Sequence, residues 1–207
     1  MNFSSINELY ENFIGDFLIK TEKREVSKPK SEKNIEVMKS LRLVYRHPII
    51  ETLLLSMVLI QIISGLKLFW QERNTAVSGF EKLHLYTGLY LASFLLFHVI
   101  AIMAGRYVLH LDTNYYFGVA GLNTFPYHLF FIPYYSLAII SFFGHVAAIH
   151  YQKMKNSSFR LAPRAQSKVI LVAGICLTLI LFYGLTNHFH GVEIPEEYNV
   201  LIGRCTR

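Results

Sequence analysis

Four long apolar runs, separated by polar segments, dominate the pattern of this chain: residues 47–70, 83–105, 126–151 and 168–188. A helix needs about 20 residues to cross the roughly 30 Å hydrocarbon layer of a bilayer, and each run reaches that length. The runs are continuously apolar and lack the in-and-out alternation of membrane barrel strands. The pattern therefore predicts an all-α fold, an integral membrane four-helix bundle.

A different pattern precedes the first run. Between about residues 4 and 20, apolar side chains recur at helical spacing with acidic residues between them, which predicts an amphipathic helix on a membrane surface, on a partner or on the protein's own loops. The next stretch, KTEKREVSKPKSEKN at 20–34, has the composition of a solvated linker. We therefore divide the chain into an amphipathic helix and charged linker at 1–46, a four-helix transmembrane domain at 47–190 and a polar tail at 191–207.

Composition agrees with a membrane protein. Hydrophobic residues make up 53% of the 207 residues and the mean hydropathy is +0.34, which argues against a soluble globular domain. The net charge is +6, but the basic residues flank the apolar runs, as topology signals do, so we expect a lipid bilayer as partner and no nucleic acid. The basic residues are nearly balanced between the two sides, and the orientation stays open.

Histidines inside the apolar runs are the main candidate functional residues. His84 and His98 are 14 positions apart, which on a helix is a rise of about 21 Å with a residual rotation of about 40°. They therefore share nearly one stripe, on which Gly88 also lies. Imidazole is a strong axial ligand for haem iron, and a glycine beside it leaves room for the flat face of a porphyrin.

Depth along the helices separates the histidines. His98 and His145 lie several residues inside apolar runs, where ionisable residues are costly and usually functional. Histidines near the ends of membrane spans often lie at the level of the lipid headgroups instead. In this chain the histidines near span ends are His47, His84, His128 and His150.

Ligand pairing follows from the same depths. If the second and third helices are antiparallel, His84 and His150 lie at nearly one height, with His145 about 7 Å deeper. One haem b between His84 and either His145 or His150 is therefore expected, and both pairings stay open. The partner of His98 is undetermined. We expect His84, His98, His145 and His150 as iron ligands of one or two haems, with His47, His128 and His188 as alternates.

Three segments resemble the cytochrome b anchor subunits of succinate dehydrogenases and fumarate reductases: TGLYLASFLLFH, SFFGHVAAIHYQKM and LAPRAQSKVILVAGICLTLILFYGL. The first two runs also resemble consecutive helices of the cytochrome b subunits of nickel-iron hydrogenases and formate dehydrogenases. Both families hold haem b between helices and exchange electrons with quinone. One departure from the first family is Gln61, which takes the position of a haem histidine.

The resemblance implies an electron-transfer subunit of a redox complex rather than an enzyme acting alone, in a bacterial inner membrane. The chain has neither a cysteine cluster nor a Gly-rich phosphate loop, so the electron donor is expected to be a peripheral flavoprotein, iron–sulfur or hydrogenase-type subunit. Arg106, Asp112 and the tyrosines of the loop after the second run are candidates for quinone contacts. Membrane-interface anchoring would also explain those tyrosines.

Two other classes of function stay open. The first is a histidine-ligated diiron or zinc membrane enzyme, in which HVAAIH at 145–150 and HFH at 188–190 would be the metal-binding motifs. The four-span topology places these two motifs on opposite faces of the membrane. The second class is a non-catalytic membrane assembly protein.

Overall fold

The computed structural model describes residues 30–154 and 161–204. The amphipathic helix predicted at 4–20 lies outside the described residues. The chain divides into two compact units, residues 1–41 and 42–207. Helix α2 (Lys30–Tyr45) begins in the first unit and ends in the second. The last residues of the predicted solvated linker are helical, from Lys30 on. Residues 30–45 contain many residue types that favour helices.

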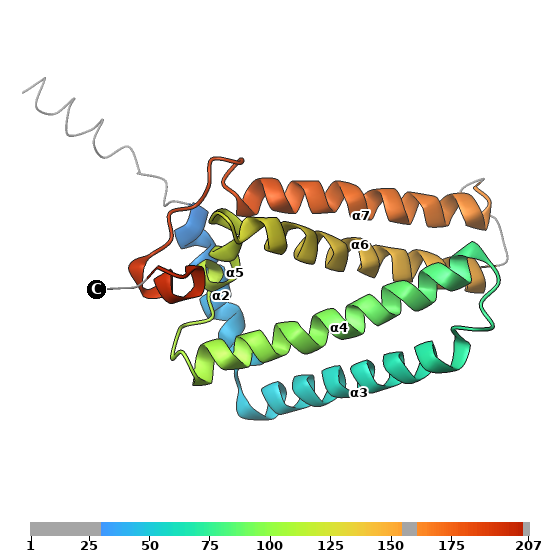
Figure 1. Ribbon diagram of the computed structural model, residues 1–207, viewed down its shortest axis with the longest axis horizontal. Coiled ribbons are helices and arrows are strands. Elements are labelled where there is room, and N and C mark those ends of the chain that lie inside the picture. The colour runs from blue at the N-terminus through green and yellow to red at the C-terminus, as the bar shows by residue number, and fades with distance from the viewer. Residues whose placement is uncertain (1–29, 155–160, 205–207) are drawn as a thin grey trace, which may run out of the picture. The chain divides into compact units, whose positions relative to one another are not determined.

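Four long helices form the second unit: α3 (Pro48–Glu72), α4 (Gly79–Tyr107), α6 (His128–Lys153) and α7 (Pro163–Leu185). Each is long and apolar enough to cross a membrane. They run side by side in chain order with alternating direction (Figure 1). Helix α4 packs against α3 and α6, and α6 also packs against α7. The predicted all-α class with four membrane-spanning helices is confirmed, with no strand among the described residues.

Local sequence signals place the helix ends. Helix α4 begins with a capping box, in which the hydroxyl of Ser78 accepts from the backbone of Glu81 and the Glu81 carboxylate accepts from the backbone of Ser78. Helices α3 and α7 both begin with a proline, Pro48 and Pro163, whose missing N–H costs nothing in a first turn. Helix α7 therefore starts before the apolar run predicted from residue 168.

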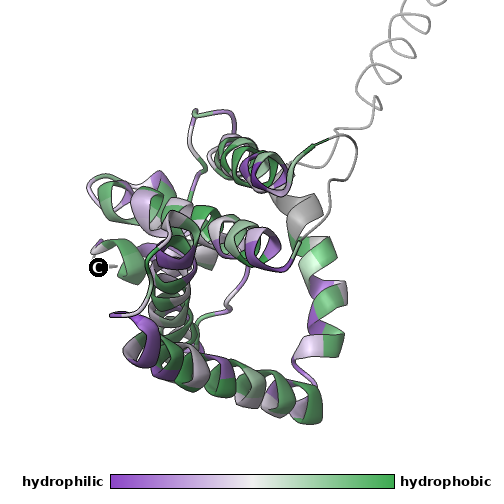
Figure 2. Ribbon diagram, turned by 90° about the vertical axis from the view of Figure 1, so that its right-hand side faces the viewer, coloured by the Kyte–Doolittle hydropathy of each residue, from purple (hydrophilic) through white to green (hydrophobic). Residues whose placement is uncertain are grey.

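Small residues bring the helices together. Helix α6 buries Ala138, Ser141, Gly144, Ala147 and Ala148, and α7 buries Gly174 and Thr178. A Cβ on Gly174 would overlap the ring of Phe143, so the glycine sets the distance between α6 and α7. Large apolar side chains lie mostly outside these contacts, and the ribbons of the long helices are largely coloured as hydrophobic in Figure 2. This division is typical of helices that pack inside a lipid bilayer.

The loop between α4 and α6 is folded rather than extended. It contains α5 (Tyr115–Val119), capped by the Asn114 side chain, and the short helix η1 (Gly121–Asn123). The C-terminal helix η2 (Glu196–Ile202) packs against α5. Tyr198 of η2 is fully buried, and its hydroxyl donates to the carbonyl oxygen of Asp112 at 2.9 Å. Part of the segment predicted as a polar tail therefore packs against the protein through η2, and the buried Tyr198 anchors it.

Candidate functional site

Two of the predicted haem ligands meet between α4 and α6. His84 lies in the second turn of α4, and His145 lies about two turns before the end of α6. Because the two helices are antiparallel, both residues come to one end of the helix pair. Their imidazole ring centroids are 4.4 Å apart, with a 39° angle between the ring planes. The structure therefore brings His84 together with His145.

A backbone contact orients the His145 ring. Its Nδ1 atom lies 3.2 Å from the carbonyl oxygen of His84 and 3.4 Å from the hydroxyl oxygen of Thr87. A carbonyl oxygen can only accept, so Nδ1 carries the proton in this contact and Nε2 keeps its lone pair. Histidines that bind metals usually have this arrangement, with the second ring nitrogen donating to a carbonyl or carboxylate.

Two glycines allow this close approach. A Cβ on Gly88 of α4 would lie 3.2 Å from Cε1 of His145, so the imidazole rests directly on the α4 backbone. A Cβ on Gly144 of α6 would lie 3.0 Å from the methyl group of Thr87. The stripe that carries His84 and Gly88 in the sequence is thus the surface of α4 that receives His145.

The donor chemistry of this pair fits haem iron, since it offers two imidazoles from neighbouring helices and one ring is held in the metal-binding tautomer. The spacing seen here is too short for iron, and it would fit only if one side chain rotated. Imidazole–metal bonds are about 2.0 Å long, so two axial nitrogens stand about 4 Å apart and their ring centroids further still. The 4.4 Å between the centroids of His84 and His145 is shorter than this, and one ring must turn outward to bind iron.

The other two predicted ligands have different surroundings. The ring of His98 stacks on Phe94, with centroids 5.1 Å apart, and meets the edge of Tyr135. His150 places Nε2 2.8 Å from the amide oxygen of Gln166 in α7, and the Gln166 amide donates to the Leu161 carbonyl. His150 therefore joins α6 to the start of α7, while His145 is the histidine beside His84.

The alternate histidines lie at the opposite end of the long helices. His47 is the exposed residue before α3, His128 opens α6 beside Phe125, and His188 follows α7 beside Tyr183. The HVAAIH and HFH motifs are accordingly at opposite ends of the helices. Within residues 30–154 and 161–204, no group of three or more histidine, cysteine or acidic side chains is placed to hold one metal ion.

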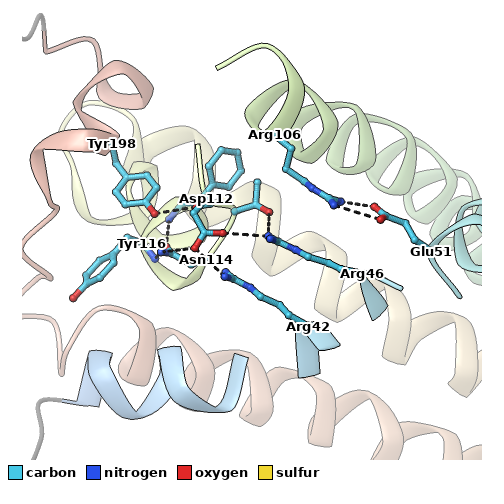
Figure 3. Close-up of polar contacts among 10 residues, drawn as sticks. Arg42, Arg46, Glu51, Arg106, Asp112, Asn114, Tyr116 and Tyr198 are labelled. Carbon is cyan, nitrogen blue, oxygen red and sulfur yellow. Dashed lines mark hydrogen bonds and ion pairs between the residues drawn. The ribbon is translucent and has the colours of Figure 1, made fainter. Parts of the chain in front are cut away.

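A polar cluster that the sequence did not reveal lies at that opposite end (Figure 3). Asp112 accepts from Arg42 at 2.8 Å and from Arg46 at 3.2 Å, and Arg46 also donates to the Thr113 hydroxyl at 2.9 Å. Arg106 forms a bidentate ion pair with Glu51. Two quinone-contact candidates, Arg106 and Asp112, are therefore ion-paired. The sequence feature that could have indicated this cluster is the spacing of Arg42 and Arg46, which are one helical turn apart just before the first apolar run.

The charges of this cluster reinforce one another. Burial alone would raise the pKa of Asp112, but the hydrogen bonds and positive charges of Arg42 and Arg46 outweigh it, and the pKa lies below its ordinary value. Burial would lower the pKa of Arg42, yet the contacts with Asp112 and Tyr45 raise it instead. Both groups are therefore charged at neutral pH.

Comparison with known proteins provides no further guide to the family. No protein-family model, curated protein or solved structure matches this chain. The likeness to cytochrome b subunits rests on the motifs of the sequence and stays a prediction.

Proposed function

We propose that this chain is a membrane-embedded haem b electron carrier in which His84 and His145 would hold the haem iron. The main support for this proposal is that the two imidazole rings face each other across the α4–α6 interface.

Haem b, when bound, supplies reversible one-electron exchange. Two imidazole ligands would suit that role, because an iron whose ligands all come from the protein and the porphyrin favours electron transfer over oxygen chemistry. The protein's own part is to hold the donors. Thr87 and the His84 carbonyl keep the proton of His145 on Nδ1, which leaves Nε2 as the ligating atom. His84 would supply the second imidazole from the facing helix.

The position of the pair also suits electron transfer. Leu85 and Ala148, next to the pair on α4 and α6, are both buried. An apolar shell around a metal site limits the access of solvent to it. His98 and His150 are the remaining candidates for a second haem, which the proposal does not require.

The proposal extends to the partners of the chain. The similarity to cytochrome b anchors supports quinone as one electron partner and a peripheral redox subunit as the other, in a bacterial inner membrane. The described part of the chain consists of membrane-spanning helices, short connecting helices and loops, and it shows no separate domain for a donor cofactor. The chain would therefore work as the membrane anchor of a complex.

An optical spectrum of the purified protein tests the haem proposal. The reduced wild-type protein should show a haem b spectrum, which His84→Gln and His145→Gln should each remove or reduce by at least half. His110→Gln, a change in an exposed loop, should leave the spectrum unaltered. A circular dichroism spectrum confirms that the variants remain helical.

The opposite results are equally informative. A wild-type spectrum in both His84→Gln and His145→Gln would refute the ligand pair. Bound iron or zinc without haem would favour the metal enzyme, and a protein with neither would favour the assembly protein. If haem is present, oxidation of the reduced protein by a quinone analogue and recovery of a flavoprotein, iron–sulfur or hydrogenase-type subunit in a pull-down test the two partners.

A further inference from the structure

The arginine cluster at the other end of the helices contains donors that its own carboxylates do not satisfy. Nε and Nη2 of Arg42 and Nε of Arg46 are enclosed by protein but have no hydrogen-bond partner among the described residues. Enclosed charged donors are nearly always paired, because leaving one unpaired carries a desolvation cost that a bound acceptor removes. Three such atoms on two neighbouring side chains indicate an acceptor with several oxygens.

The charge of the cluster indicates an anion. Three guanidinium groups, those of Arg42, Arg46 and Arg106, face two carboxylates, those of Glu51 and Asp112. Arg106 uses both oxygens of Glu51, so that pair is closed. Arg42 and Arg46 share the single carboxylate of Asp112 and retain one positive charge. Guanidinium groups bind phosphate oxygens with particular preference, since their planar N–H donors match the spacing of those oxygens.

The location of the cluster identifies the source of the phosphate. Glu51 lies in the first turn of α3, Arg106 lies in the last turn of α4, and Asp112 follows in the loop. These positions are at the ends of two membrane-spanning helices, where lipid headgroups lie. Basic groups at this depth typically contact anionic lipid headgroups. A lipid phosphate is held at this level by the bilayer itself, whereas a soluble ligand is not.

We propose that Arg42 and Arg46 form a binding site for the phosphate group of an anionic phospholipid. In the lipid-bound protein the side chains that cover these N–H groups move aside and the N–H groups donate to the phosphate oxygens, while Asp112 keeps the two guanidinium groups side by side. The site is separate from the His84–His145 pair and does not depend on the presence of haem.

Native mass spectrometry of the full chain, released from mixed phosphatidylcholine and phosphatidylglycerol nanodiscs, tests this site. The wild-type protein should retain phosphatidylglycerol in preference to phosphatidylcholine. Arg42→Gln/Arg46→Gln should weaken phosphatidylglycerol binding about tenfold or more, as expected for the loss of several charge-assisted hydrogen bonds. Arg42→Lys/Arg46→Lys should also weaken it, because lysine keeps the charge but lacks the Nε donor.

Two further variants make the result independent of folding defects. Arg73→Gln removes a positive charge at the other end of the helices, where the guanidinium lies over Trp70, and should leave binding unchanged. Asp112→Asn removes the competing negative charge but keeps an acceptor oxygen to hold the two guanidinium groups, and it should strengthen binding. Equal retention of phosphatidylglycerol by wild type and both double variants would overturn the proposal. Displacement of the lipid by millimolar inorganic phosphate would also overturn it, since the site would then bind free phosphate.

Discussion

The Nδ1 atom of His145 lies 3.2 Å from the carbonyl oxygen of His84, so one residue of the pair orients the other through its backbone. This contact does not depend on the His84 side chain. A substitution at His84 therefore removes one imidazole without releasing the other, and the two positions can be tested separately.

The first prediction concerns the glycine beneath the His145 ring. Gly88→Leu should displace the imidazole, because even a Cβ at position 88 would lie 3.2 Å from the Cε1 atom of His145. We expect the variant to fold but to lose the haem b spectrum. The matched control is Gly184→Leu in α7, where nothing lies within 4 Å of the added Cβ. Full haem content in Gly88→Leu would show that haem binding does not depend on the position of the His145 ring.

Membrane topology provides the second prediction. The α3–α4 and α6–α7 connections should face one side of the membrane, and the α4–α6 connection should face the other. With both native cysteines replaced, single cysteines at Asn74 and Leu161 should react with an impermeant thiol reagent from the same side, and a cysteine at His110 from the opposite side. All three positions are exposed. Labelling of positions 74 and 161 from different sides would rule out four spans in this order.

The third prediction concerns the docked C-terminal helix. Burial raises the pKa of Tyr198, so its hydroxyl stays protonated at neutral pH and can donate to the Asp112 carbonyl. Tyr198→Phe should destabilise the docked helix by about 1 kcal/mol, the value of one hydrogen bond. Tyr198→Ala should cost about 3 kcal/mol or more, because it also leaves a cavity.

Hydrogen exchange of residues 196–202 measures this docking. Exchange should accelerate slightly in Tyr198→Phe and strongly in Tyr198→Ala, while Val200→Ala, at an exposed position, should resemble wild type. Unchanged exchange in Tyr198→Ala would show that η2 docks without its tyrosine.

The fourth prediction is a pH dependence at Asp112. Arg42 and Arg46 depress the pKa of this carboxyl in the folded protein, so its ion pairs stabilise the fold above the unfolded pKa of about 3.9. That stabilisation is lost as the pH falls through the lower, folded pKa. Wild type should therefore exceed Asp112→Asn in thermal stability by a constant margin from pH 7 to about pH 5, and the margin should shrink below about pH 4.

Thermal unfolding at a series of pH values checks this. The side-chain partners of Asp112 are the guanidinium groups of Arg42 and Arg46 and the neutral amide of Asn114, and Tyr198 contacts its backbone carbonyl. The arginines keep their charge over this range. Glu193→Gln, at an exposed carboxylate, is the control and should follow the wild-type curve. A margin that grows toward acidic pH would contradict the depressed pKa.

The sequence by itself determined the four membrane-spanning helices and the candidate histidines. Apolar runs of about 20 residues have one stable solution in a bilayer, because a helix satisfies all its backbone groups within the segment. The spacing of His84 and Gly88 also placed both residues on one surface of α4, since helical periodicity is a local property.

Tertiary structure decided which residues meet. Sequence depth left both His145 and His150 open as partners of His84, and the structure places the His145 ring over Gly88 while Gln166 binds His150. The partners of Asp112, Arg42 and Arg46, precede it by about 70 positions. The docking of Tyr198 on the loop of Asp112 is equally remote in sequence. Such contacts depend on how the helices pack and where their ends meet, and no local pattern of residues records that arrangement.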